Sequence, residues 1–147
     1  MHKESLMSCV IVGTALLFSV PGCGQKKINE CNQLIEVINK GVDSLNKASK
    51  SNSADPTGTT EYKTMADTMD AVAADAAKVE LTVPELKKLS QDYQTMAKDV
   101  AKAARDMVAA ADSQDFAKVN TAKAAVEKAV KQEDPLVDSI NKFCHAP

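Results

Sequence analysis

Apolar residues between positions 28 and 50 recur at alternating steps of three and four residues, which is the spacing of one face of an α-helix. This seam consists of Ile28, Cys31, Ile35, Ile38, Val42 and Leu45. Leu34 and Val37 widen the apolar stripe. The pattern predicts an amphipathic helix over about 28–50 whose seam packs into a core.

The same spacing recurs further along the chain and predicts helices over about 60–81, 82–111 and from 114 onward. The second seam is Tyr62, Met65, Met69, Val72, Ala76 and Val79. The third is Leu86, Leu89, Tyr93, Met96, Val100, Ala103, Met107 and Ala110. The fourth is Phe116, Val119, Ala122, Val126, Ala129, Leu136, Ile140 and Phe143. Because the alternating apolar pattern of strands is absent, we expect an all-α fold.

Turn-forming and capping residues separate these helices. The polar segment 51–58 ends the first helix with a proline and a glycine, and Thr59 or Thr60 is expected to cap the second. The sequence Thr82-Val83-Pro84-Glu85 has the form of a capping box with proline in the first turn. Asp112-Ser113 is expected to break the third helix and to cap the fourth.

The last helix contains an interruption. Glu133 breaks the apolar stripe, and Pro135 lacks the backbone N–H that a helix interior requires. We therefore expect either a kink at Pro135 or a new short helix capped by Asp134.

Four helices with short connections favour an up-down-up-down antiparallel four-helix bundle over residues 28–147. Many seam positions are alanine, which lets helix axes approach closely and needs few large side chains in the core.

The first 22 residues have a different character. A short basic start at His2 and Lys3 precedes an apolar run at 9–20, which suits a signal peptide and is shorter than the roughly 20 residues of a membrane span. We expect residues 1–22 to be a cleaved signal peptide.

The end of that segment, Val20-Pro21-Gly22-Cys23, resembles the lipobox of bacterial lipoproteins, in which an aliphatic residue and two small positions precede an acceptor cysteine. The resemblance implies cleavage before Cys23, a diacylglycerol on its sulfur, and a lipidated tether over residues 23–27. Gly24 follows in place of aspartate, which weakly favours the outer membrane. The alternatives are an ordinary secreted protein cut after Gly22 and an uncleaved anchor.

The chain has four cysteines. Cys9 lies in the expected signal peptide and Cys23 is the expected lipid acceptor, which leaves Cys31 and Cys144 near the two ends of the mature chain. An even pair in an exported protein indicates a disulfide. In the expected topology the first and last helix ends lie together, so the cysteine pairing and the helical periodicity favour the same architecture.

Charge excludes some partners and suggests others. The formal net charge is −2, whereas nucleic-acid-binding domains are usually strongly basic, so no nucleic-acid partner is expected. The segment 61–80 carries an excess of acids and the segment 26–50 an excess of lysines. Complementary faces between adjacent helices explain this difference, and a protein-docking surface is the alternative.

The sequence predicts no catalytic, cofactor or metal site. His145 is the one histidine outside the signal peptide, and no G-x-S-x-G or Glu-x-x-His motif occurs. A haem ligated by His145 and Met65, Met96 or Met107 is the weaker alternative to methionines that fill the core. Glu133 is the sole candidate ligand on a core face, and we expect it to be partly exposed. The pair Asp67/Asp70 has helical spacing but faces outward.

We therefore expect a lipid-anchored, non-enzymatic interaction or structural module of the bacterial envelope, whose partner is an envelope protein or wall polymer. The alternative is a bundle that binds an apolar small molecule in a cavity between its helices. The short tether places the disulfide end near the membrane, where Lys26 and Lys27 either touch lipid head groups or merely keep the tether soluble.

Overall fold

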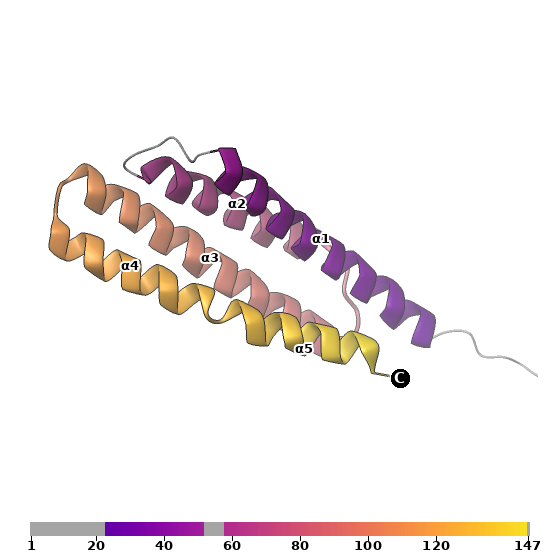
Figure 1. Ribbon diagram of the computed structural model, residues 1–147. Coiled ribbons are helices and arrows are strands. Elements are labelled where there is room, and N and C mark those ends of the chain that lie inside the picture. Colours follow the sequence, from indigo (N-terminus) through magenta and orange to yellow (C-terminus); the bar gives the residue numbers. More distant parts are fainter. Residues whose placement is uncertain (1–22, 52–57, 147) are drawn as a thin grey trace, which may run out of the picture.

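The computed structural model describes residues 23–51 and 58–146, and the expected signal peptide at 1–22 lies outside them. The described chain is all-helical, as predicted, and contains no strand (Figure 1). Its helices are α1 (Cys23–Ser51), α2 (Thr59–Lys78), α3 (Pro84–Asp112), α4 (Phe116–Val130) and α5 (Glu133–His145).

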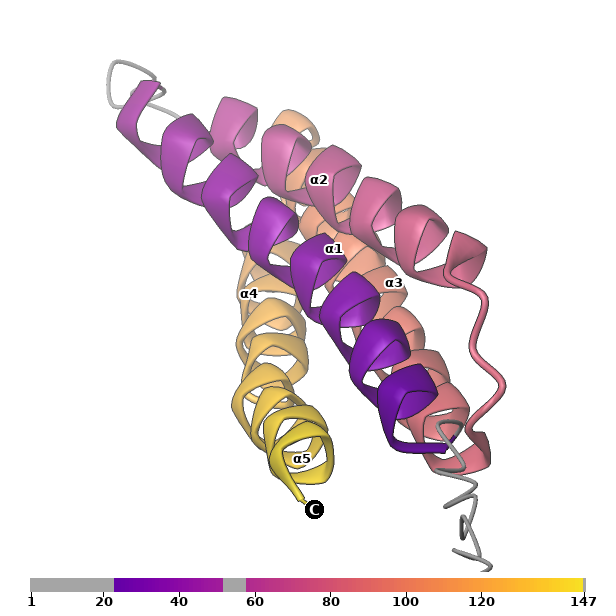
Figure 2. The same cartoon turned by 90° about the vertical axis from the view of Figure 1, so that its right-hand side faces the viewer.

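Helix α3 lies at the centre of the helical bundle. It packs against α2 on one side and against α4 and α5 on the other (Figures 1 and 2). Helix α1 packs against α2 and, at one end, against α5, but it makes no comparable contact with α4. Among the described helices, α1 is therefore held mainly by α2.

The central position of α3 explains its composition. The predicted seam residues Leu86, Tyr93, Met96 and Val100 are buried. Small residues that the seam did not include are buried as well: Ser90, Ala97, Ala101 and Ala104. They carry little side-chain volume, so neighbouring helices can pack against α3 on more than one face.

Helix α1 is rotated relative to its predicted seam. Cys31, Leu34 and Ile38 are buried, but Ile28 and Val42 are 49% and 40% exposed, so the prediction was wrong for these two. The physical reason is Gly41, which is buried against Val72 of α2. A glycine allows the helix axes to approach at that point and so turns the neighbouring Val42 outward.

The predicted helix caps were largely wrong. The residue before α2 is Gly58, whose φ of 68° is left-handed, so neither Thr59 nor Thr60 is the cap. The residue before α3 is Val83, whose own side chain makes no capping hydrogen bond, so the predicted capping box at Thr82-Val83-Pro84-Glu85 does not form. Asp115 caps α4 by accepting a hydrogen bond from the Lys118 backbone N–H at 3.1 Å, in place of Asp112-Ser113.

The interruption near Pro135 separates two helices, which confirms the expected short last helix. Pro135 is the third residue of α5 and lies in its first turn, where backbone N–H groups have no helical partner and proline is tolerated. Asp134 is not the cap, because α5 already begins at Glu133 and Gln132 precedes it. Phe116, expected in the core, is 81% exposed because it starts α4 beyond the end of its packed face.

Candidate functional site at the disulfide end

Cys23, the expected lipid acceptor, is the first residue of α1. Residues 23–27, which the sequence suggested as a tether, form the beginning of that helix. Lys26 is exposed on it, whereas Lys27 is half-buried. A group attached to Cys23 is therefore joined to the bundle through a continuous helix.

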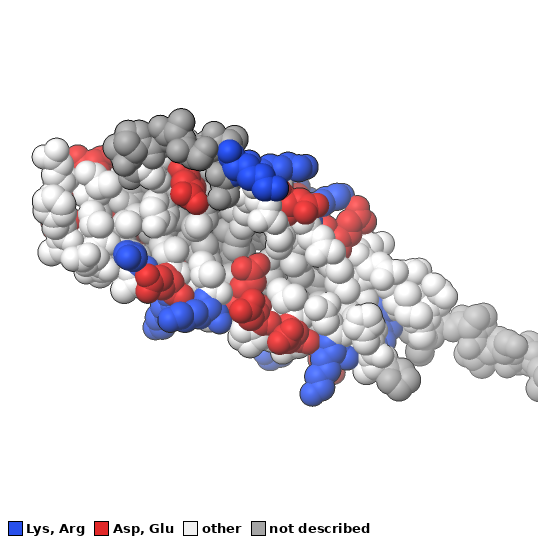
Figure 3. Space-filling view, in the orientation of Figure 1, with Lys and Arg blue, Asp and Glu red and all other residues white. Residues whose placement is uncertain are grey.

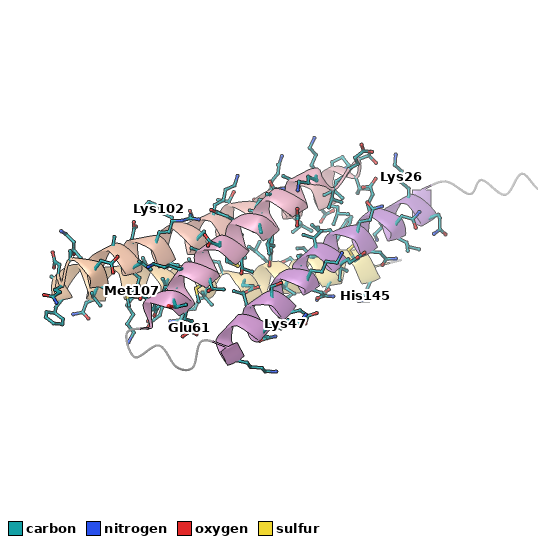
Figure 4. The ribbon with its side chains drawn as sticks, turned by 90° about the horizontal axis from the view of Figure 1, so that it is seen from above. Lys26, Lys47, Glu61, Lys102, Met107 and His145 are labelled. Atoms are coloured by element: carbon teal, nitrogen blue, oxygen red, sulfur yellow. A yellow bond between two sulfur atoms is a disulfide. The ribbon has the colours of Figure 1, made fainter. Side chains whose placement is uncertain are left out.

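Cys31 and Cys144 form a disulfide with a Cα–Cα distance of 5.7 Å, which confirms the predicted pairing. The bond joins α1 to α5 across 113 positions of sequence. Cys31 is almost fully buried and Cys144 is half-buried. Figure 4 places Lys26 and His145 at this end of the bundle, and Glu61 and Met107 toward the other.

Lys27 adds two contacts beside the disulfide. Its Nζ donates a hydrogen bond to the backbone oxygen of Ala146 at 2.6 Å and lies 4.7 Å from the centroid of the Phe143 ring. The second contact has the geometry of a cation–π interaction. Lys27 thus contacts the end of α5, and Lys26 is the exposed lysine of this pair.

Glu30 connects α1 to the turn before α3. Its carboxylate accepts hydrogen bonds from the Thr82 N–H at 2.9 Å, the Thr82 hydroxyl at 2.5 Å and the Val83 N–H at 3.1 Å. These bonds occupy donors at the start of α3 that a local capping residue would otherwise satisfy. The Thr82 hydroxyl, followed by the Val83 and Thr82 N–H groups, lowers the pKa of Glu30 against the opposing effect of its burial.

Glu133 is half-buried beside the core. The hydroxyl of the buried Tyr93 donates to Glu133 Oε1 at 3.4 Å. Burial raises the pKa of Glu133 and also that of Tyr93. The carboxylate that interrupts the apolar stripe therefore supplies the hydrogen-bond partner of a core tyrosine.

The acidic face of α2 pairs with α3. Arg105 donates to Asp70, and its guanidinium lies 3.6 Å from an oxygen of Asp67. On α1, Lys40 pairs with Glu36 in the same helix at 2.7 Å. Complementary charges thus do join adjacent helices, but they join α2 to α3, and no ion pair between α1 and α2 occurs among the described residues.

The described residues contain no group of three side chains placed to hold a metal ion. Met96 is buried in the core, while Met65 and Met107 are half-buried. A groove of about 530 Å³ runs between α3 and α4 and is lined by Ala109, Ala110, Ala122 and Ala125 with polar residues around them. Within the described ranges, no helix is long and apolar enough to cross a membrane.

Sequence reasoning identified the disulfide but missed Glu30, because its partners lie 52 and 53 residues away and no local motif marks the contact. A comparison of this chain with known protein families, curated proteins and solved structures finds no match.

Proposed function

We propose that this chain is a bacterial envelope lipoprotein, anchored through Cys23, whose helical domain is a non-enzymatic interaction module. The observation that carries the proposal is the segment Val20-Pro21-Gly22-Cys23, which resembles a lipobox and follows an apolar run. Cleavage before Cys23 would leave the described helices, which lie within residues 23–51 and 58–146, intact. Gly24 in the next position weakly favours the outer membrane, where the cell has one.

The proposed topology is an up-down-up-down four-helix bundle in which α4 and α5 together form the last helix. The short connections at 79–83 and 113–115 support it, because such connections favour antiparallel neighbours. The disulfide supports it too, because it joins the start of α1 to the end of α5. An anchor at Cys23 then places the disulfide end at the membrane, with Cys31 about 12 Å further along α1.

The far end of the bundle would meet the partner. Helix α1 has 29 residues and therefore spans about 44 Å, so the end of α1 at Ser51 and the turn between α3 and α4 lie far from the lipid. Phe116 lies exposed at the start of α4, beside that turn. An envelope protein or wall polymer is the proposed partner.

The anchor is tested by Cys23→Ser in the full chain. We expect the variant to leave the membrane fraction and the wild type to remain there with added acyl mass. The matched control is the double variant Cys31→Ser/Cys144→Ser, which loses the other two cysteines of the mature chain and should stay membrane-bound. If Cys23→Ser stays in the membrane fraction and the wild type carries no acyl mass, the anchor is refuted.

The interaction module is tested by crosslinking the anchored protein in intact envelopes and identifying the captured species by mass. Phe116→Ser is the informative variant, because it changes the exposed far end without touching the core. Loss of a defined crosslinked partner in this variant would support the proposal. A protein that captures nothing would contradict it.

The apolar-ligand alternative is favoured by one observation, the alanine-lined groove between α3 and α4. Native mass spectrometry of protein purified from its envelope tests this alternative. Extra mass that is lost on denaturation, and lost in Ala122→Gln, would assign the ligand to this groove. A native mass equal to the denatured mass would remove this alternative.

A further inference from the structure

Helix α1 carries two seams of heptad spacing. The inner seam faces the bundle and consists of Cys31, Leu34, Ile38, Gly41 and Leu45. The outer seam alternates amide and aliphatic residues at steps of three and four, and consists of Gln25, Ile28, Asn32, Ile35, Asn39, Val42 and Asn46. The exposed Ile28 and Val42 therefore belong to a second regular pattern.

The outer seam is open to solvent and uncharged. Every member is exposed except Ile35, which is half-buried. The side chains of Asn32, Asn39 and Asn46 make no hydrogen bond to any other described residue. Figure 3 shows an uncharged strip between the charged residues of α1 and those of α4 and α5. On its far side, Val130 of α4 is 40% exposed.

We propose that the outer seam pairs with the same seam of a second copy of this chain, as a short parallel two-stranded coiled coil. In heptad terms the amides occupy position a and the aliphatic residues occupy position d. Asparagine at position a pairs with its equivalent across a two-fold axis and specifies register and a two-stranded state. The seam is thus self-complementary, as a symmetric dimer interface requires.

The outer seam is not covered by α4, because α1 makes few contacts with that helix. Val130 of α4 is also partly exposed. Glu36 occupies the flanking position e and its partner Lys40 position b, so their ion pair borders the seam and neither residue lies within it. No charged residue of α1 would have to be desolvated within the seam itself.

This inference rests on the proposed anchor for its strength. Several polar residues in position a weaken a coiled coil, so we expect little pairing in dilute solution. Two copies anchored through Cys23 would stand parallel, with their outer seams at the same height above the lipid, because Cys23 and the seam belong to the same helix. Confinement to the membrane raises the effective concentration of each copy for the other.

The test uses the full chain in its own membranes with a single added cysteine. Asn39→Cys places a thiol in the outer seam, and its matched control Gln33→Cys places one at another exposed position of α1, away from the seam. Mild oxidation should give a covalent dimer with Asn39→Cys and only the wild-type background with Gln33→Cys. Adding Val42→Lys to Asn39→Cys should abolish the dimer while the thermal melt stays unchanged.

Separate readouts distinguish the two proposals. A dimer from Asn39→Cys in protein that fractionates as soluble would support the seam and overturn the anchor. Membrane-bound protein that gives no dimer at Asn39→Cys would overturn the seam and leave the anchor standing. Equal dimer yields at Asn39→Cys and Gln33→Cys, or a dimer that survives Val42→Lys, would indicate random collision and overturn the seam.

Discussion

Gly41 of α1 lies directly against Val72 of α2: a Cβ atom added at Gly41 would clash with Cγ2 of Val72. This contact helps to set the rotation of α1 about its axis, together with the Cys31–Cys144 disulfide and the hydrogen bond of Glu30 with Thr82. With position 41 turned toward α2, Leu34 and Ile38 turn into the core and Val42 turns out. The missing side chain at position 41 thus favours burial of the seam that contains Leu34 and Ile38.

Gly41→Ala should destabilise the protein. Alanine gains about 1 kcal/mol of helix propensity over glycine, but overpacking a close contact costs about 1–3 kcal/mol. The contact should dominate because Val72 is β-branched and has one strongly preferred rotamer in a helix. We therefore expect the free energy of unfolding in urea to fall by up to about 2 kcal/mol.

The control for Gly41→Ala is the same substitution at Gly24, where an added Cβ meets nothing within 4 Å. There the propensity gain stands alone, so Gly24→Ala should not destabilise. A Gly41→Ala variant more stable than the wild type would show that α1 and α2 are less closely packed at this point.

Leu34→Ala and Val42→Ala should differ sharply. Leu34 is fully buried, and truncating a buried leucine costs about 2–5 kcal/mol. Val42 is 40% exposed, and substitutions at such surface positions usually change stability by less than about 0.5 kcal/mol. Urea denaturation of the monomer measures both changes. A larger loss of stability in Val42→Ala than in Leu34→Ala would instead support the seam first predicted from the periodicity of α1, in which Val42 is buried.

The sequence predicted the helices and the disulfide because both depend on regular signals, namely apolar spacing and an even pair of cysteines. It could not choose between two overlapping seams of α1. Ile28 and Val42 have the same spacing as the true core residues, and the choice depends on Gly41 meeting a residue of another helix. Phe116 was misplaced for a similar reason, since apolar spacing does not show where packing against a neighbour ends.

At the candidate site, too, one contact could be predicted from the sequence and another depended on tertiary packing. The pairing of Cys31 with Cys144 follows from counting, whereas the contact of Glu30 with Thr82 depends on how α1 and the start of α3 meet. The segment from Thr82 to Glu85 was predicted to be a local capping box. In the structure, the acceptor for the Thr82 and Val83 N–H groups is instead Glu30 of α1. Sequence patterns therefore located the helix start, and tertiary packing supplied its partner.

Glu30→Gln should weaken the fold at neutral pH and have little effect in acid. The native pKa of Glu30 is lowered, so its contribution to stability is present above the unfolded-state value of 4.5 and is lost as the pH falls through the lowered native value. The difference in melting temperature between variant and wild type should therefore shrink steadily below pH 4.5. Thermal melts across pH 7 to pH 2 measure it.

Thr82→Val provides the matching test for Glu30, because it removes the hydroxyl donor and keeps the backbone N–H. A double-mutant cycle between Glu30→Gln and Thr82→Val should show coupling at pH 7 that disappears in acid. Independent effects of the two substitutions at pH 7 would mean that the carboxylate does not bind this hydroxyl in solution.

Glu133→Gln should have the opposite effect on stability to Glu30→Gln and should stabilise the fold at neutral pH. Burial raises the native pKa of Glu133, so its protonated carboxyl contributes fully to the stability of the fold below the unfolded-state pKa of 4.5. This contribution is lost as the pH rises through the raised native pKa. Glutamine removes the buried charge and keeps an oxygen acceptor for Tyr93. The variant should melt above the wild type at pH 7 and equal to it below pH 4.5. Glu127→Gln, at an exposed position of α4, is the control that should leave the profile unchanged.

Removing the disulfide should cost about as much stability as the most costly single-side-chain change discussed above. Cys31 and Cys144 are 113 positions apart, and closing a loop of that length stabilises by about 4–5 kcal/mol in the chain-entropy model. Domains of this size are stable by only about 5–15 kcal/mol in total, so the variant Cys31→Ala/Cys144→Ala should be marginal. Urea denaturation of this variant beside wild-type protein, with and without reductant, measures the loss. Reductant should bring the wild type down to the variant and leave the variant unchanged. If the wild type is indifferent to reductant, or its folded state reacts with thiol reagents at both positions, the two cysteines are not bonded.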